Sequence, residues 1–264
     1  MRILWIDPIG TDAFSSDAAD MLRAAGLPGT RVDVVSLPEE GRPKHLEYHA
    51  YEALVTADIV KLVYGLASEY NAIVIGCFYD VGLSAAREVS GNTIVTAPCQ
   101  SSVSIAAQLG HRFSILVGRE KWMPQMIDNV RMYGFEHQLA SMRPLGLGVH
   151  DFQSDPGLTQ ARLLEQGRKA VEEDGAEVLI LGCTAEYGFQ ERMQETLRVP
   201  VIEAMQAPFK MAEFLADTAE RFGWYPSRHG GSEAPPTDEV SEWSLFAGDL
   251  PIGTYFKDEG YNES

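Results

Sequence analysis

Cysteine is scarce in this sequence, and its scarcity excludes several classes of protein. The 264 residues include 3 cysteines, Cys77, Cys99 and Cys183, which lie far apart in the chain. An odd, widely spaced set does not form the disulfide framework of a secreted domain. It does not form a structural zinc site either, because such a site needs Cys or His ligands at short spacings. We therefore expect reduced thiols, as in the cytoplasm.

Basic residues are also few, with 21 Lys and Arg against 38 Asp and Glu, a formal net charge of −17. This charge would repel a phosphate backbone and an anionic membrane surface, so we expect neither nucleic acid nor membrane as a partner. No run of about 18 apolar residues occurs, which disfavours a membrane-spanning helix. The first residues lead directly into a strand pattern, so we expect no signal peptide. A small molecule is the expected partner, and the cytoplasm is the expected location.

Short apolar runs alternate with longer amphipathic segments along most of the chain. The alternation predicts an α/β fold with two pseudo-symmetric, doubly wound lobes, each a mostly parallel sheet flanked by helices, and an active site in the cleft between them. The predicted strands are 2–6, 31–37, 72–75, 93–97, 112–117, 177–181 and 200–202. The predicted helices are 17–25, 48–69, 81–89, 103–109, 121–133, 158–173, 189–197 and 208–222.

Two of the predicted strands end in the same dipeptide. The segment Ala72-Ile73-Val74-Ile75-Gly76-Cys77 is matched by Val178-Leu179-Ile180-Leu181-Gly182-Cys183, and a helix pattern follows each. This similarity indicates two lobes of related design, each with a Gly-Cys at the carboxyl end of a strand, where open α/β sheets bind ligands. We expect residues 1–97 and 205–224 to form lobe 1 with Cys77, and residues 98–204 to form lobe 2 with Cys183.

Residues 225–264 form a C-terminal extension in which the alternating pattern is lost. The extension is rich in Pro, Gly and acidic residues, a composition typical of a linker or tail. It also carries five large apolar side chains: Trp243, Leu245, Phe246, Tyr255 and Phe256. We therefore expect it to pack on a neighbouring subunit of a homo-oligomer, either a dimer or a tetramer.

Cys77 and Cys183 are the expected catalytic residues. A strand that ends in Gly-Cys and turns into a helix would place the thiol at the helix N-terminus, where backbone N–H groups and the helix dipole favour the thiolate. Two such thiols on opposite sides of one substrate would remove a proton from one face of a carbon and deliver another to the opposite face, which is racemisation. This chemistry needs no cofactor and no metal. Taken alone, each cysteine is also consistent with a small buried residue at a strand end.

The segments around both cysteines resemble the aspartate/glutamate/hydantoin racemase superfamily, and the resemblance covers about residues 1–224. It rests on IGCFYDVGL from Ile75, GHRFSIL from Gly110 and LGCTAE from Leu181, the first two being most similar to hydantoin racemases. The resemblance implies two α/β lobes, paired catalytic cysteines, no cofactor and an oligomer. It also implies that the backbone of Phe78, Thr184 and Ala185 holds the oxygens of the substrate.

The sequence departs from hydantoin racemases at other expected pocket positions. After the first strand those enzymes usually have Asn-Pro-Asn-Thr, whereas this chain has Asp7-Pro8-Ile9-Gly10-Thr11. The family often has a glutamate where this chain has Cys99, followed by Gln100, and Arg119 stands near the place of the usual hydroxyl residues. We expect Asp7, Cys99, Gln100 and Arg119 to contribute to substrate binding.

Three of these residues have an alternative interpretation. A guanidinium binds a carboxylate with two parallel hydrogen bonds, which is the role expected of Arg119, but this residue is also consistent with an exposed charge beside Glu120. Cys99 is alternatively a core residue after Pro98, and Asp7 a cap or turn residue. His45 and His49 lie four residues apart, as metal ligands on one helix face would, but a solvated helix face explains them better, and we expect no metal site.

These features favour a cofactor-independent racemase or isomerase that acts on a carbon next to a carbonyl. The expected substrate is a 5-substituted hydantoin or a related cyclic ureide or amino-acid derivative. The same scaffold would suit a cysteine-dependent decarboxylase, a cis-trans isomerase or a thiohydantoin desulfhydrase that breaks a C–S bond. A binding protein with two lobes around a cleft is a third interpretation, which leaves the two Gly-Cys sites without a purpose.

Overall fold

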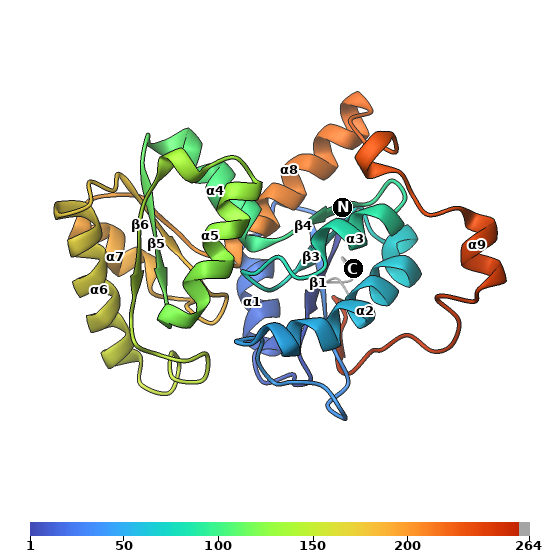
Figure 1. Cartoon of the computed structure of the whole chain (residues 1–264), viewed down its shortest axis with the longest axis horizontal. Coiled ribbons are helices and arrows are strands. Elements are labelled where there is room, and N and C mark those ends of the chain that lie inside the picture. Colours follow the sequence, from blue (N-terminus) through green and yellow to red (C-terminus); the bar gives the residue numbers. More distant parts are fainter. Residues whose placement is uncertain (259–264) are drawn as a thin grey trace, which may run out of the picture. The chain divides into compact units, whose positions relative to one another are not determined.

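The computed structural model describes residues 1–258, and the chain divides into two compact units. Unit 1 consists of Met1–Gly76, Val81–Thr96 and the chain from Phe209 onward, and unit 2 consists of Cys77–Asp80 and Ala97–Pro208. Figure 1 follows the chain through its helices and strands. The short segment Cys77–Asp80 groups with the unit that contains Cys183, whereas the sequence-based boundaries place it in lobe 1.

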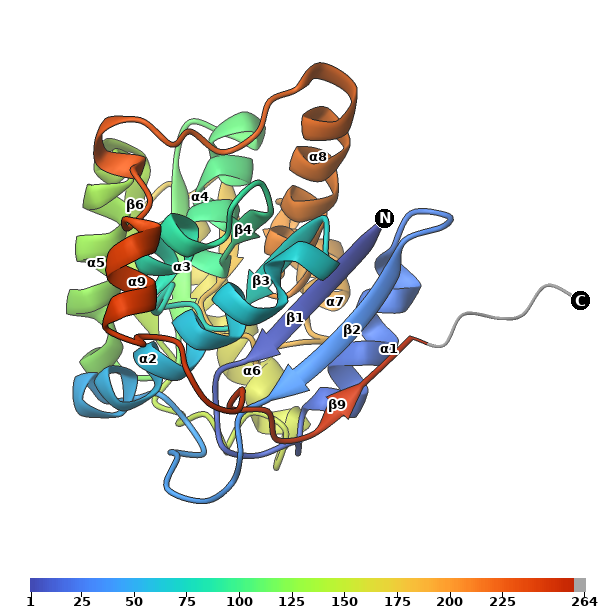
Figure 2. The same cartoon turned by 90° about the vertical axis from the view of Figure 1, so that its right-hand side faces the viewer.

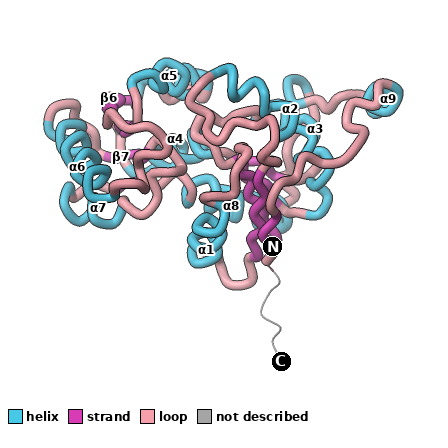
Figure 3. Tube along the Cα trace, turned by 90° about the horizontal axis from the view of Figure 1, so that it is seen from below, coloured by secondary structure: helices cyan, strands magenta, loops and turns pink. Residues whose placement is uncertain are grey.

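The sheet of unit 1 has the strand order β4-β3-β1-β2-β9, and its first four strands are parallel. These strands are β1 (Arg2–Asp7), β2 (Arg31–Ser36), β3 (Ala72–Ile75) and β4 (Ile94–Thr96). Helix α1 (Ser15–Ala25) lies on one face of the sheet, and α2 (His49–Leu66) and α3 (Leu83–Val89) lie on the other (Figure 3). All residues of β3 and β4 are buried, as expected for strands covered on both faces.

The sheet of unit 2 has the strand order β6-β5-β7-β8, and all of its pairs are parallel. Its strands are β5 (Phe113–Val117), β6 (Leu139–Pro144), β7 (Val178–Leu181) and β8 (Val201–Ile202). One face carries α4 (Pro98–Leu109) and α5 (Met123–Met132), and the other carries α6 (Pro156–Glu172) and α7 (Gln190–Leu197) (Figure 1). The predicted α/β class, with parallel sheets flanked by helices, is confirmed.

The two sheets repeat one topology. When β1 to β4 are matched in order to β5 to β8, the strand order β4-β3-β1-β2 becomes β8-β7-β5-β6. A helix follows each of these strands, so α4 completes the first half of the chain as α8 (Gln206–Phe222) completes the second. The internal similarity around the two Gly-Cys dipeptides therefore reflects a repeat of the whole β-α pattern.

Several elements have weaker sequence signals and were not predicted. Strand β6 has one buried residue, so it lacks the apolar run that marked the other strands. Helix α9 (Thr237–Glu242) and strand β9 (Tyr255–Phe256) are short elements of the extension. Four 3₁₀ turns complete the described chain: Ala67–Glu69, Glu120–Trp122, Glu136–Gln138 and Gly230–Ser232. Among residues 1–258, no helix is long and apolar enough to cross a membrane.

The C-terminal extension is part of unit 1 and packs on its sheet and on α2. Strand β9 pairs antiparallel with β2, and the Phe246 ring stacks on the Tyr64 ring of α2 with 4.2 Å between the ring centroids. Figure 2 shows the segment after α9 passing over α2 to the β2 edge of the sheet. The extension thereby pairs a strand edge that would otherwise be open. The expected contact with a neighbouring subunit stays a prediction, and residues 259–264 of the extension lie outside the described residues.

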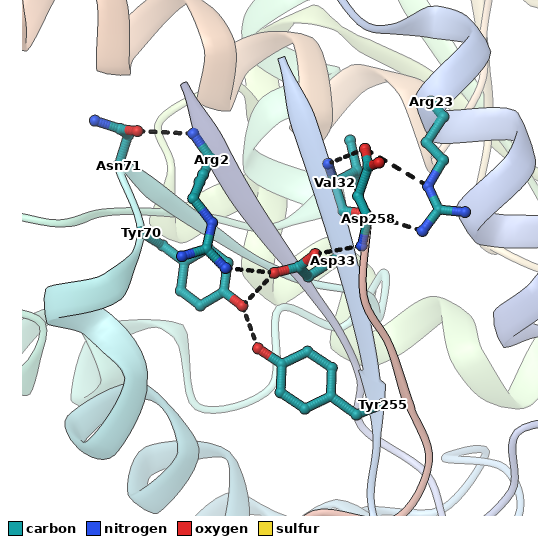
Figure 4. A network of polar contacts seen from close by, with 8 residues as sticks. All are labelled: Arg2, Arg23, Val32, Asp33, Tyr70, Asn71, Tyr255 and Asp258. Carbon is teal, nitrogen blue, oxygen red and sulfur yellow. Dashed lines mark hydrogen bonds and ion pairs between the residues drawn. The ribbon is translucent and has the colours of Figure 1, made fainter. Parts of the chain in front are cut away.

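Asp33 of β2 joins the extension to the N-terminal ends of the first strands (Figure 4). Its buried carboxylate accepts hydrogen bonds from the Arg2 guanidinium at 2.9 Å, the Tyr70 hydroxyl at 2.6 Å and the Asp258 backbone N–H at 2.7 Å. The Tyr70 hydroxyl also contacts the Tyr255 hydroxyl of β9. Burial, and then the hydrogen bond to Asp33, raise the pKa of Tyr70, so its hydroxyl stays a neutral donor.

Asp33→Ala is expected to lower the free energy of unfolding by about 3 kcal/mol, because three donors lose their buried acceptor. Urea unfolding at pH 7 measures this change. Asp217→Ala is the matched control, since it removes an exposed ion pair with Arg221 of 2.7 Å and should leave the midpoint almost unchanged. Equal midpoints for the two variants would contradict the role given to Asp33.

Candidate active site

A glycine extends each central strand by one residue beyond its last regular pair. The Gly76 N–H donates to the Ile6 carbonyl at 2.8 Å, and the Gly182 N–H donates to the Leu116 carbonyl at 2.7 Å. A Cβ at Gly76 would lie 2.6 Å from the Trp5 indole, and a Cβ at Gly182 would lie 2.6 Å from the Leu116 carbonyl oxygen. Both positions require glycine for this close approach.

Each glycine is followed by a cysteine that opens a tight turn. The Asp80 N–H donates to the Cys77 carbonyl at 2.9 Å, and the Glu186 N–H donates to the Cys183 carbonyl at 3.0 Å. Both cysteines are half-buried. The two turns therefore present their thiols in equivalent positions of the repeated topology, at the carboxyl ends of β3 and β7.

The prediction that each thiol lies at the start of the following helix is wrong. Helix α3 begins at Leu83 and α7 begins at Gln190, six and seven residues beyond the cysteines. Asp80 and Gly82 have φ of 54° and 70°, and Gly188 has φ of 86°. These left-handed conformations interrupt a right-handed helix, so the chain leaves each cysteine in a loop.

Asp80 binds the Cys77 turn to the start of α4. Its Oδ1 accepts a hydrogen bond from the Cys99 N–H at 2.8 Å, and its Oδ2 accepts from the Gln100 N–H at 2.9 Å and the Tyr133 hydroxyl at 2.7 Å. Asp80 therefore caps α4 from outside the helix, using N–H groups that have no partner within it. The Asn129 side chain adds a bond of 2.8 Å to the Tyr79 carbonyl.

Glu186 is the matching acid of the Cys183 turn, but its surroundings differ. It is 0% exposed, and among the described residues neither of its carboxylate oxygens has a hydrogen bond of good geometry. Burial raises the pKa of Glu186 well above its ordinary value, the N–H groups of Gly182 and Cys183 oppose this shift, and the charge of Glu203 adds to it. Burial without a well-formed hydrogen bond therefore favours the neutral form of Glu186.

Glu203 takes the N–H groups at the start of α8. Its Oε1 accepts from the Met205 N–H at 2.9 Å, and its Oε2 accepts from the Gln206 N–H at 2.8 Å. Burial raises the pKa of Glu203 to about 7, against the effect of these two donors. In the first half of the chain, the acid of the cysteine turn, Asp80, itself binds the helix start. In the second half, Glu203 binds the helix start, and the acid of the cysteine turn, Glu186, is a second buried carboxyl group.

The other predicted residues of the cysteine loops lie in unit 2. Phe78 and Ala185 are buried, and Thr184 is half-buried. The Ala185 carbonyl accepts a hydrogen bond from the Gln153 side chain at 3.0 Å, which supports the Cys183 turn. Arg119 is half-buried and precedes the turn Glu120–Trp122.

Cys99 and Asp7 are more enclosed than the two catalytic candidates. Cys99 is 0% exposed, and burial, with a further effect of the Asp80 charge, raises the pKa of its thiol. Asp7 belongs to unit 1, where its oxygens accept hydrogen bonds from the Trp5 indole at 2.7 Å and from the Ser15 hydroxyl. Burial raises the pKa of Asp7. Cys99 is thus enclosed in the core and Asp7 is held at the end of β1, and their expected part in substrate binding stays a prediction.

Sequence reasoning missed Asp80, Glu186 and Glu203. A signal for the first two is present, because an acid follows each cysteine at the third position in Gly76-Cys77-Phe78-Tyr79-Asp80 and Gly182-Cys183-Thr184-Ala185-Glu186. No cluster of three His, Cys, Asp or Glu within residues 1–258 is arranged to hold a metal ion. His45 instead packs its ring near Tyr51, with 5.4 Å between the centroids.

Comparisons with known proteins show the family and the fold. A model of the family described as Asp/Glu/Hydantoin racemase matches residues 3–212. A hydantoin racemase from Pseudomonas sp. (strain NS671) is 32% identical over 84% of this chain and 88% of its own. An allantoin racemase from Klebsiella pneumoniae superposes with a TM-score of 0.82 and 27% identity, over 90% of this chain and 94% of that one. A maleate isomerase from Pseudomonas putida S16 shares the fold, with a TM-score of 0.62 and 17% identity over 82% and 93% of the two chains.

Glu203→Gln is expected to change how stability depends on pH. A carboxyl group with an ordinary pKa of 4.5 and a folded pKa of about 7 stabilises the fold fully below pH 4.5 and loses that contribution as the pH rises through 7. Between pH 5 and pH 8 the wild type should therefore lose about 2.5 kcal/mol that the variant, which cannot ionise there, retains. Urea unfolding at a series of pH values tests this, with the exposed Glu191→Gln as control. Parallel curves for wild type and Glu203→Gln would refute it.

Proposed function

This chain belongs to the Asp/Glu/hydantoin racemase family, and from that premise we propose that it racemises a carbon next to a carbonyl, with Cys77 and Cys183 as the acid and base. The observation that carries the proposal is the pair of equivalent Gly-Cys turns at the ends of β3 and β7. Because both turns belong to unit 2, the two thiols are parts of one compact body.

The proposed reaction uses the acidity of a C–H bond beside a carbonyl. One cysteine, as thiolate, removes the proton from one face of the carbon, and the other, as thiol, delivers a proton to the opposite face. The next turnover in the reverse direction uses the cysteines in exchanged roles. Backbone groups of Phe78, Thr184 and Ala185 hold the oxygens of the substrate. No cofactor takes part, since the carbonyl itself stabilises the carbanion.

A cyclic ureide is the proposed substrate class. Two of the relatives described above are a hydantoin racemase and an allantoin racemase, whose named substrates contain the same five-membered ring. We propose position 5 of a 5-substituted hydantoin as the reacting carbon. Arg119 would select substituents that carry a carboxylate. The thiols must stay reduced, so we place the enzyme in the cytoplasm. We also propose that it is a homo-oligomer.

A cysteine-dependent decarboxylation, cis-trans isomerisation or desulfhydration is the second candidate. The segment at the end of β1 favours it, because this segment lacks the two amide side chains expected of hydantoin racemases, and Asp7, the last residue of β1, is engaged by Trp5 and Ser15. A covalent adduct of substrate with Cys77 or Cys183, detected by mass spectrometry, would support this candidate over racemisation.

Single enantiomers of 5-substituted hydantoins and of allantoin, incubated in D₂O, should lose optical rotation and gain deuterium at position 5. Cys77→Ser and Cys183→Ser should each lower the rate of racemisation by about 10³-fold, because each removes one of the two proton carriers. Polarimetry and proton NMR measure the two effects. The proposal fails if the wild type exchanges no proton with any of these compounds.

Iodoacetamide is expected to label Cys77 and Cys183 in the folded protein and to leave Cys99 unmodified. Cys77 and Cys183 are half-buried, whereas Cys99 is 0% exposed and its pKa is raised. Peptide mass spectrometry measures the labelling, and a bound hydantoin should protect both reactive cysteines. Equal labelling of all three would show that exposure and ionisation do not distinguish them.

A further inference from the structure

The two halves of the chain place an acid at the same point of each cysteine turn, three residues after the cysteine. In the first half, Asp80 reaches the start of α4 and its oxygens accept three hydrogen bonds. In the second half, the corresponding helix is α8, and Glu203 occupies its first N–H groups. Glu186 is therefore the equivalent of Asp80 without a helix start to bind.

Glu186 lies close to the backbone of Cys183, although its carboxyl group binds no helix start. Its N–H closes the turn onto the Cys183 carbonyl at 3.0 Å, and its carboxyl group interacts with the N–H groups of Gly182 and Cys183. Its side chain is 0% exposed, and both oxygens lack a well-formed hydrogen bond among the described residues. A buried carboxyl group in this condition avoids ionisation.

We propose that Glu186 is a positioning residue for Cys183, and that its buried carboxyl group sets the charge beside this cysteine and thereby controls how readily the thiol ionises. Within the described part of the chain, the charged group that acts on Glu186 is Glu203, from the segment between β8 and α8. This inference rests on the proposed function only in taking Cys183 as one of the two proton carriers.

The charge balance explains what the arrangement would do. While Glu186 is neutral, the turn adds no negative charge beside Cys183, and the thiolate forms as readily as the rest of the site allows. Once Glu186 ionises, its negative charge opposes a second one on the sulfur of the same turn, so the Cys183 thiol ionises less readily. Cys77 has no such dependence, because Asp80 is bonded to the start of α4. The two cysteines therefore differ in their response to pH.

The test is the rate at which iodoacetamide alkylates each cysteine of the full-length protein between pH 6 and pH 10, resolved by peptide mass spectrometry. Glu186→Gln keeps the shape of the side chain and cannot ionise in this range. The ratio of Cys183 alkylation rates, variant over wild type, should rise about 3- to 10-fold from the low end to the high end of this pH range, because only the wild type gains a charge at residue 186. The ratio for Cys77 should stay near 1 at every pH.

Glu186→Met is a second variant, in case the buried amide prevents folding. It replaces an unsatisfied carboxyl with an apolar side chain of similar size, so it should fold, raise Tm by about 2–5 °C and give the same rise in the Cys183 ratio. Glu191→Gln, an exposed change on α7, should leave both ratios at 1. The inference is overturned if folded Glu186→Gln or Glu186→Met keeps a Cys183 ratio of 1 throughout, or if Cys77 changes equally.

These measurements use no substrate, so they separate the inference from the proposed function. The expected alkylation ratios together with no racemisation of any hydantoin would refute the proposed function and leave the role of Glu186 standing. Racemisation by the wild type together with a flat Cys183 ratio would refute the role of Glu186 alone.

Discussion

Close packing at the ends of β3 and β7 determines where both cysteines lie. A carbonyl oxygen at Gly182 and an indole ring at Gly76 occupy the space that a Cβ would need, 2.6 Å away in each case. Both glycines still donate a hydrogen bond to the neighbouring strand, so the next residue is the first that can leave the sheet. That residue is a cysteine at the carboxyl edge of a parallel sheet, the edge at which such folds bind ligands. Any larger residue at Gly182 would have to move β7 or β5, and the thiol with it.

The repeat of the β-α pattern produces two similar turns, and the helix starts make them unequal. The first N–H groups of a helix have no partner within it, and one carboxylate can accept hydrogen bonds from two of them. Asp80 does so at α4, but Glu203 does so at α8, which leaves Glu186 buried beside a second acid. Duplicated architecture thus yields chemically distinct surroundings for Cys77 and Cys183.

The fold and the family could be predicted because their signals are local. Strand β3 was predicted residue for residue, and the racemase resemblance and the enzyme class are confirmed by the family match over residues 3–212. Strand β6 was missed because its side chains are mostly half-buried and show no apolar run. The turns after the cysteines depend on the positive φ of Asp80, which no helix propensity reveals. Glu186 lacks a helix start to bind because Glu203, 17 residues later, accepts hydrogen bonds from the first N–H groups of α8. A contact between residues this far apart in the chain cannot be read from a local sequence pattern.

The extension and the altered loop after β1 are physically linked. The family match ends at residue 212, and the extension returns to the end of β2, where a Cβ on Gly253 would lie 2.3 Å from the Leu37 carbonyl oxygen. From there the Thr254 hydroxyl donates to Asp12 at 2.8 Å, while the Leu37 N–H donates to the Ile9 carbonyl at 3.1 Å. Ile9 and Asp12 belong to the loop after β1. The extension therefore helps to fix the loop at the carboxyl end of β1, the edge of the sheet at which such folds bind ligands.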